Sequence, residues 1–281
     1  MVIERAGMLL GKKSNELSGY EIFFLLLAIH FHDVGNIYGR EKHEEKIEEV
    51  FEALGDKLPL DNAAKYVILL IATAHGGNID GNKDTIAHLK EVEYIDSLPV
   101  RVSMLAAVLR FSDEIADDKN RTSVFLIESE AIPDPNFAFH MYSKCLEPPV
   151  FKGDAMLLMY CIPYEYTQKK VKKNNEDVYL YDEILSRLQK CLCELDYCKK
   201  YSQGFIRLSS ISVHIAVKKE NKLKSMYDVD FRLRLIGYPS INLYQPLSNC
   251  AESKIEIENG EKLAQLIGGQ ENDSKKSVYN N

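Results

Sequence analysis

The sequence has no apolar run long enough to cross a membrane: its longest, Ile22–Ile29, is far shorter than the roughly 20 residues that a spanning helix needs. It also lacks an excess of basic residues, since 42 Asp and Glu outnumber 35 Lys and Arg and leave a net charge of -7. This balance argues against a general nucleic-acid binder or a protein held on an anionic membrane, because both need a basic face. The first residues show no short apolar segment followed by a small-residue cleavage site, so we expect no secretion signal.

Cysteine is sparse, and all six cysteines follow position 144. Their density is too low for a disulfide scaffold, which favours a reducing cytoplasm. A phosphate-binding loop is also missing, because Gly268-Gly269 is not followed by Lys and then Ser or Thr. The remaining composition, 46% hydrophobic and 27% charged over 281 residues, is typical of a globular protein of about two domains.

The first half of the chain has helical patterns and no alternating strand pattern. Ser18 and Glu21 form a capping-box motif ahead of an apolar helix that we expect to end at Phe31. Three further helices are expected over Glu44–Leu54, from Asp61 to His75, and over Val100–Glu114. We therefore predict an all-α domain over residues 1–128.

The second half has period-two, aromatic and β-branched patterns that are typical of strands. The expected strands are Ala138–Cys145, Ala155–Tyr166, Ile211–Lys218 and Tyr227–Tyr238. An amphipathic helix is expected over Asp182–Tyr201, with Cys191 and Cys198 on its apolar stripe, where they read as core residues and not as a zinc site. These elements predict an α+β domain over residues 129–257, with an antiparallel sheet covered by a helix. We expect residues 258–281 to form a mostly flexible tail.

Side chains that bind metals recur at the ends of the expected N-terminal helices. His32 and Asp33 are adjacent where the apolar helix ends, while His43, His75 and Asp113 lie at the ends of three other helices. Helix ends in a bundle can converge on one pocket, so we predict that these five residues hold one or two divalent ions. Nitrogen and oxygen ligands without a thiolate favour Mn²⁺, Fe²⁺, Co²⁺, Ni²⁺ or Mg²⁺, and the sequence does not distinguish among them.

These residues resemble the HD superfamily of metal-dependent phosphohydrolases, whose signature is an early His, a His-Asp pair and a late Asp. The stretch from Phe31 to Asn36 is similar to the family's helix-end motif, and Leu109–Arg121 is similar to the segment around its last metal-binding Asp. The resemblance spans roughly residues 1–125. It implies that His32, Asp33 and Asp113 bind a first metal, that Asp33 bridges two metals, and that His43 and His75 bind the second.

One ligand of the family pattern has no counterpart here. The family's first His precedes the His-Asp pair by two or three dozen residues, whereas residues 1–29 contain no histidine. His30 is a poor substitute, because two positions along a helix from His32 it points to a different face. Two explanations stay open: the coding sequence begins upstream of Met1, or this protein has lost a ligand and with it some or all activity.

The resemblance implies hydrolysis of a nucleotide or other phosphoester by a metal-activated water, with Asp33 in the catalytic centre. Arg40, Lys42 and Arg121 are the candidates for binding the substrate and offsetting charge on the phosphoryl oxygens, and Asn36 for orienting it. The alternative reading of these cations is that they are solvated loop charges.

A second hypothesis is a catalytically impaired sensor that binds a nucleotide without turnover. In either case the α+β domain could contact a protein partner or a second copy of the chain.

Overall fold

The computed structural model describes residues 1–121, 137–174, 176–219, 224–237 and 240–279. The chain divides into two compact units. The first contains Met1–Ala116, Cys193–Arg207 and Ile236–Tyr244, and the second contains Asp117–Leu192, Leu208–Leu235 and Gln245–Asn281. The predicted domain boundary after residue 128 lies outside the described residues.

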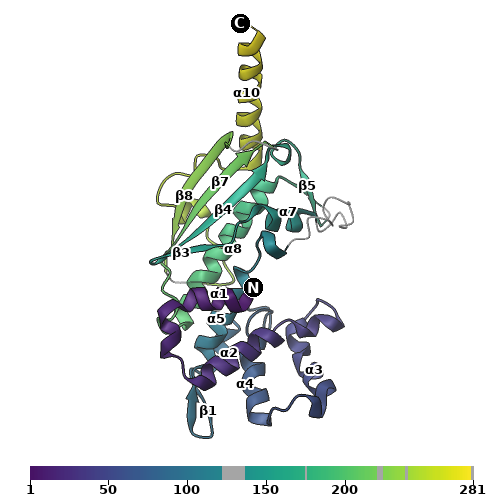
Figure 1. Cartoon of the computed structure of the whole chain (residues 1–281), viewed down its shortest axis with the longest axis vertical. Coiled ribbons are helices and arrows are strands. Elements are labelled where there is room, and N and C mark those ends of the chain that lie inside the picture. Colours follow the sequence, from purple (N-terminus) through teal and green to yellow (C-terminus); the bar gives the residue numbers. More distant parts are fainter. Residues whose placement is uncertain (122–136, 175, 220–223, 238–239, 280–281) are drawn as a thin grey trace. The chain divides into compact units, whose positions relative to one another are not determined.

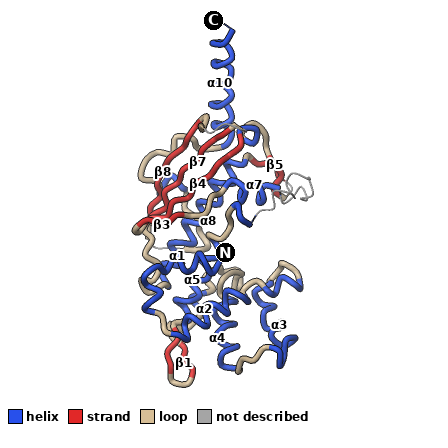
Figure 2. Tube along the Cα trace, viewed as in Figure 1, coloured by secondary structure: helices blue, strands red, loops and turns tan. Residues whose placement is uncertain are grey.

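The first unit is helical, as the sequence predicts (Figure 2). Its helices are α1 (Val2–Leu10), α2 (Gly19–Phe31), α3 (Ile47–Leu54), α4 (Asn62–Thr73) and α5 (Val102–Glu114). It also contains a small hairpin of β1 (Glu93–Ile95) and β2 (Leu98–Val100), whose three-residue strands are too short to show an alternating pattern in the sequence.

Helix α5 forms the core of this unit, because every residue from Val102 to Ser112 is buried. Helices α1, α2 and α4 pack against it. The predicted capping box is confirmed: the Ser18 side chain accepts from the Glu21 backbone N–H, and the Glu21 carboxylate accepts from that of Ser18. The same carboxylate pairs with Arg101, at 2.6 Å, and so ties the start of α2 to the start of α5. The predicted metal ligands His32 and Asp113 lie at the opposite ends of these two helices.

The second unit is built on a four-stranded sheet with the order β3-β4-β7-β8 (Figure 1). These strands are β3 (Val150–Lys152), β4 (Ala155–Pro163), β7 (Ser210–Lys218) and β8 (Tyr227–Arg234). Buried residues alternate with more exposed ones along β4 and β8, and helices α7 (Phe137–Cys145) and α8 (Leu180–Tyr201) cover the buried face. The remaining elements are β5 (Val171–Lys173), β6 (Glu176–Val178), α9 (Leu247–Cys250) and α10 (Gly260–Tyr279).

The fold class predicted from the sequence, a helical domain followed by an α+β domain, is confirmed, with one correction to the sheet. Strands β3 and β4, and β7 and β8, pair antiparallel, but β4 and β7 run parallel. The reason is the connection: α8 separates β4 from β7 in the sequence, and a helical crossover returns the chain so that the second strand runs in the same direction.

One further prediction for this half is wrong. Residues Ala138–Cys145 form helix α7 and not a strand, because the buried Ala138, Met141, Tyr142 and Cys145 follow the i, i+3, i+4, i+7 spacing of a helix. Within residues 258–281, where we expect a mostly flexible tail, Gly260–Tyr279 form helix α10, which buries Leu263 and Ile267 one turn apart.

Among the described residues, no single helix is both long and apolar enough to cross a membrane. By length and composition alone, the pair Gly19–Tyr38 and His43–Lys57, bent by 102°, would qualify.

Candidate metal centre

The five predicted metal ligands lie in the first unit, four of them at or just beyond the C-terminal ends of helices. His32 caps the end of α2 and Asp33 follows it, His75 follows the last residues of α4, and Asp113 lies in the last turn of α5. His43 begins the 3₁₀ turn η3 (His43–Lys46). Helix C-termini carry partial negative charge on their unpaired carbonyls, so the ends of three helices favour a cation here.

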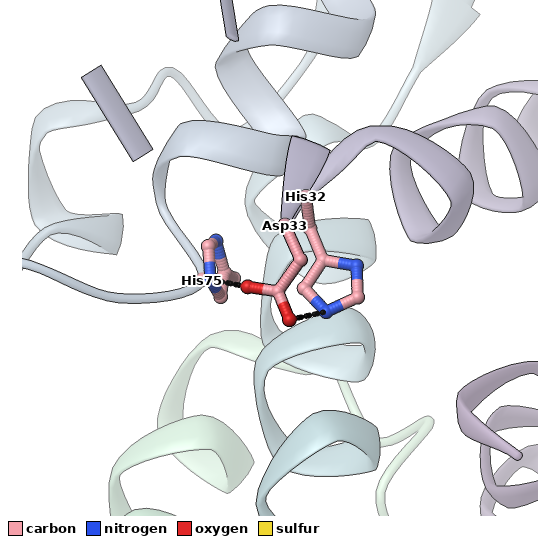
Figure 3. A group of neighbouring side chains, drawn as sticks. All are labelled: His32, Asp33 and His75. Atoms are coloured by element: carbon pink, nitrogen blue, oxygen red, sulfur yellow. Dashed lines mark ion pairs between the residues drawn. The ribbon is translucent and has the colours of Figure 1, made fainter. Parts of the chain in front are cut away.

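Imidazole groups come together around the carboxylate of Asp33, and Figure 3 shows those of His32 and His75. Its Oδ1 lies 3.0 Å from Nε2 of His43 and 3.9 Å from Nε2 of His75, and its Oδ2 lies 3.6 Å from Nε2 of His32. Asp113 reaches the same imidazole from α5, with its Oδ1 3.4 Å from Nε2 of His32. His32, Asp33 and His75 each offer a ligand atom within 4.8 Å of the other two.

Each of the three histidines is oriented by a backbone carbonyl. Nδ1 of His32 lies 2.7 Å from the carbonyl oxygen of Ile29, Nδ1 of His75 lies 2.5 Å from that of Ala72, and Nδ1 of His43 lies 3.2 Å from that of Arg40. A carbonyl can only accept, so Nδ1 carries the proton in each ring. In a neutral imidazole this leaves the lone pair on Nε2, which is the arrangement that metal-binding histidines use.

The residues present fit a cation between them. The Nε2 atoms of His32 and His43 are buried and have no hydrogen-bond partner among the described residues. With Nδ1 protonated, the lone pair of His43 Nε2 faces the Asp33 carboxylate oxygen at 3.0 Å, which is repulsive unless a proton or a metal ion lies between the two atoms. Buried nitrogen lone pairs facing carboxylates are the donor set of a divalent-metal site.

Burial is the largest influence on the pKa of both His32 and His75, and it lowers each pKa because it disfavours the charged imidazolium. At His32 the nearby Asp113 carboxylate, the carbonyl of Ile29 and the charge of Asp33 together outweigh burial, so its pKa is raised above 6.5. At His75 the charge on His32 adds to burial, and its pKa is lowered. A lowered pKa favours the neutral imidazole, which is the form of histidine that binds a metal.

The residues predicted to bind substrate lie outside this cluster. Asn36, Arg40 and Lys42 are exposed, in and just after the 3₁₀ turn η2 (Val34–Tyr38) that follows Asp33. Lys42 pairs with Glu45, at 3.6 Å. The side chain of Arg121 lies outside the described residues.

The sequence analysis missed two residues that bring His43 and His75 together. Glu44 is buried, and one of its carboxylate oxygens lies 3.2 Å from Nδ1 of His43. Gly77, two residues after His75, has φ of +69°, and a Cβ there would overlap with the Glu44 carboxylate. This close approach sets the rings of His43 and His75 5.4 Å apart between centroids. The Gly76-Gly77 pair directly after His75 was the available signal in the sequence.

The comparison with protein families gives a match over the first part of the chain. The model of the family described as HD-CE matches residues 1–151, a segment that contains all five clustered residues. No curated protein and no solved structure matches the chain. Because the family model covers more than half of the 281 residues, the chain belongs to the HD-CE family.

Proposed function

We propose that the first unit binds one or two divalent metal ions and hydrolyses a phosphoester bond in a small phosphorylated molecule, with a nucleotide as the candidate substrate. His32, Asp33 and Asp113 would hold one ion, and Asp33, His43 and His75 the other. A divalent ion there would supply Lewis-acid chemistry, which makes water a nucleophile near neutral pH and offsets charge on a phosphoryl group. The observation that carries the proposal is the pair of buried, unpartnered Nε2 atoms facing carboxylates.

Asp33 is the residue that joins the two proposed ligand sets. Its Oδ2 faces His32 at 3.6 Å, while its Oδ1 faces His43 at 3.0 Å and His75 at 3.9 Å. One carboxylate therefore presents an oxygen to each side of the cluster, as a bridging ligand does. Loss of its charge would affect both ligand sets, whereas loss of His43 would affect one.

The segment directly after Asp33 supports a phosphorylated substrate. The backbone of Arg40 is held in place, because its carbonyl accepts the hydrogen bond from His43, while its side chain is exposed. The exposed pair of Lys42 with Glu45, at 3.6 Å, is weak and leaves the ammonium group available. Two exposed cations in the segment between Asp33 and His43 suit the charge of a phosphoryl group.

The proposal is tested on the purified full-length chain. Its metal content is measured by mass spectrometry after incubation with Mn²⁺, and phosphate release is measured with nucleotides and cyclic dinucleotides. Asp33→Asn is the test variant. Asp230→Asn is the matched control, since Asp230 forms a His-Asp pair with His214, at 2.8 Å, on the sheet of the second unit.

We expect the natural protein and Asp230→Asn to bind Mn²⁺ and release phosphate, and Asp33→Asn to lose both properties. Unchanged metal content in Asp33→Asn would contradict the proposed site. Metal and nucleotide binding without phosphate release would contradict hydrolysis and assign the unit to the sensor alternative.

A further inference from the structure

A buried arginine lies one turn before Asp113 on α5. Arg110 is 5% exposed, and its guanidinium forms a two-pronged ion pair with Glu194 of α8, with N···O distances of 2.7 and 3.1 Å. The guanidinium also stacks on the ring of Tyr197, 4.6 Å from its centroid. Burying this charge is costly, and the contacts that compensate for it fix the guanidinium in one orientation.

The free edge of that guanidinium holds the segment after His75. Nη1 of Arg110 donates to the hydroxyl oxygen of Thr85, at 3.0 Å, and to the carbonyl of Lys83, at 3.1 Å. Because a guanidinium can only donate, the Thr85 hydroxyl accepts from it and directs its own proton elsewhere. That proton goes to the carbonyl oxygen of Ala74, 2.8 Å away.

The Ala74 carbonyl belongs to the peptide group that leads into His75. Its oxygen is held by Thr85, and the N–H of the same planar group, on His75, donates to the carbonyl of Ala72, at 3.3 Å. The Ala72 carbonyl also receives Nδ1–H of the His75 ring, at 2.5 Å. The backbone and the ring of His75 are therefore fixed relative to one another.

We infer that Glu194, Arg110 and Thr85 form a positioning relay that orients the Nε2 atom of His75 toward the metal centre. The inference rests on the proposed function. Glu194 lies on the part of α8 that belongs to the first unit, whereas residues 180–192 of the same helix belong to the second.

The test compares variants by their affinity for Mn²⁺, measured by titration calorimetry, and by the ring nitrogen signals of His75 in the metal-free protein, measured by NMR. Thr85→Val keeps the shape of the side chain but removes the hydroxyl, and Thr85→Ser restores it. Glu194→Gln breaks the ion pair. Glu21→Gln is its matched control, since the buried Glu21 pairs with Arg101 at the far ends of α2 and α5.

We expect Thr85→Val and Glu194→Gln to lose about tenfold or more in Mn²⁺ affinity, as loss of an orienting partner does at other metal sites. In the metal-free protein they should show a mixture of the two neutral tautomers at His75. Thr85→Ser and Glu21→Gln should match the natural protein in both readouts.

The relay is refuted if Thr85→Val keeps natural affinity and a single His75 tautomer, or if Glu21→Gln loses as much affinity as Glu194→Gln. A natural protein that binds no Mn²⁺ would contradict the proposed function. The tautomer comparison in the metal-free protein would then still decide the relay.

Discussion

Substitution of Gly35 by Ala should damage the His43 side of the metal centre. Gly35 is buried in η2, two residues after Asp33. A Cβ at this position would overlap with the carbonyl oxygen of His43 and would lie 2.8 Å from its carbonyl carbon and 3.0 Å from Cβ of Lys46. Two of these three atoms are backbone atoms of η3, so no side-chain rotation removes the conflict.

The size of the effect follows from these distances. Non-bonded carbons are normally about 3.5–4.0 Å apart, so η3 must retreat by roughly 1 Å. Overpacking of this kind costs about 1–3 kcal/mol, which should lower Tm by about 2–12 °C in a unit of this size. Nε2 of His43, now 3.0 Å from Asp33, would retreat with η3 and lose contact with the shared carboxylate. We expect Mn²⁺ affinity at that side to fall about 10–100-fold.

The assay is calorimetric titration of Mn²⁺ together with thermal unfolding. Gly7→Ala on α1 is the control, because a Cβ there meets no atom within 4 Å. It should leave affinity unchanged. Natural metal affinity and stoichiometry in Gly35→Ala would refute the argument that Gly35 positions His43.

Three further predictions concern metal, acid and thiol reactivity. In the natural protein, chelation should lower Tm by about 5–11 °C relative to protein that holds divalent metal at 100 times Kd. In Asp33→Asn, thermal unfolding should detect no difference in Tm between the chelated and the metal-loaded samples. Burial raises the pKa of Glu21, but hydrogen bonds to its carboxylate and the charge of Arg101 hold this pKa below 4.5. The stabilising effect of Glu21 is therefore full above pH 4.5 and disappears as the pH falls through the lowered pKa. Denaturant unfolding should therefore find Glu21→Gln about 3 kcal/mol less stable than the natural protein at pH 7, a gap that closes in acid. Burial raises the pKa of both the Cys145 and the Cys161 thiol, but Cys145 is 2% exposed whereas Cys161 is half-buried. Iodoacetamide should therefore label Cys161 slowly and Cys145 only after unfolding, and mass spectrometry can check both rates.

Local signals in the sequence predicted most of the first unit. The capping box at Ser18, the Asp61 cap and the apolar spacing of the later helix give the bounds of α2, α4 and α5 to within a few residues. Ligand types at the ends of separate helices predicted which side chains lie together. The predicted metal binding itself stays a prediction until a metal is measured.

Long-range relations were not predictable in the same way. No local pattern shows that residues 193–207 and 236–244 join the first unit, or that Glu194 pairs with Arg110 across 84 positions of sequence. The parallel pairing of β4 and β7 depends on the path of the chain through α8 and not on the residues of either strand. The aromatic residues of Ala138–Cys145 favour a strand in the sequence, whereas the helical burial pattern of α7 becomes visible only once the segment is packed.

The most direct test of the central claim is a crystal structure of the full-length chain grown with Mn²⁺, with anomalous scattering recorded at the manganese edge. We expect an anomalous peak about 2.0–2.3 Å from Nε2 of His32 or His75 and from a carboxylate oxygen of Asp33. The central claim is contradicted if no peak lies among these residues, or if the bound ion is found elsewhere while the three side chains face apart.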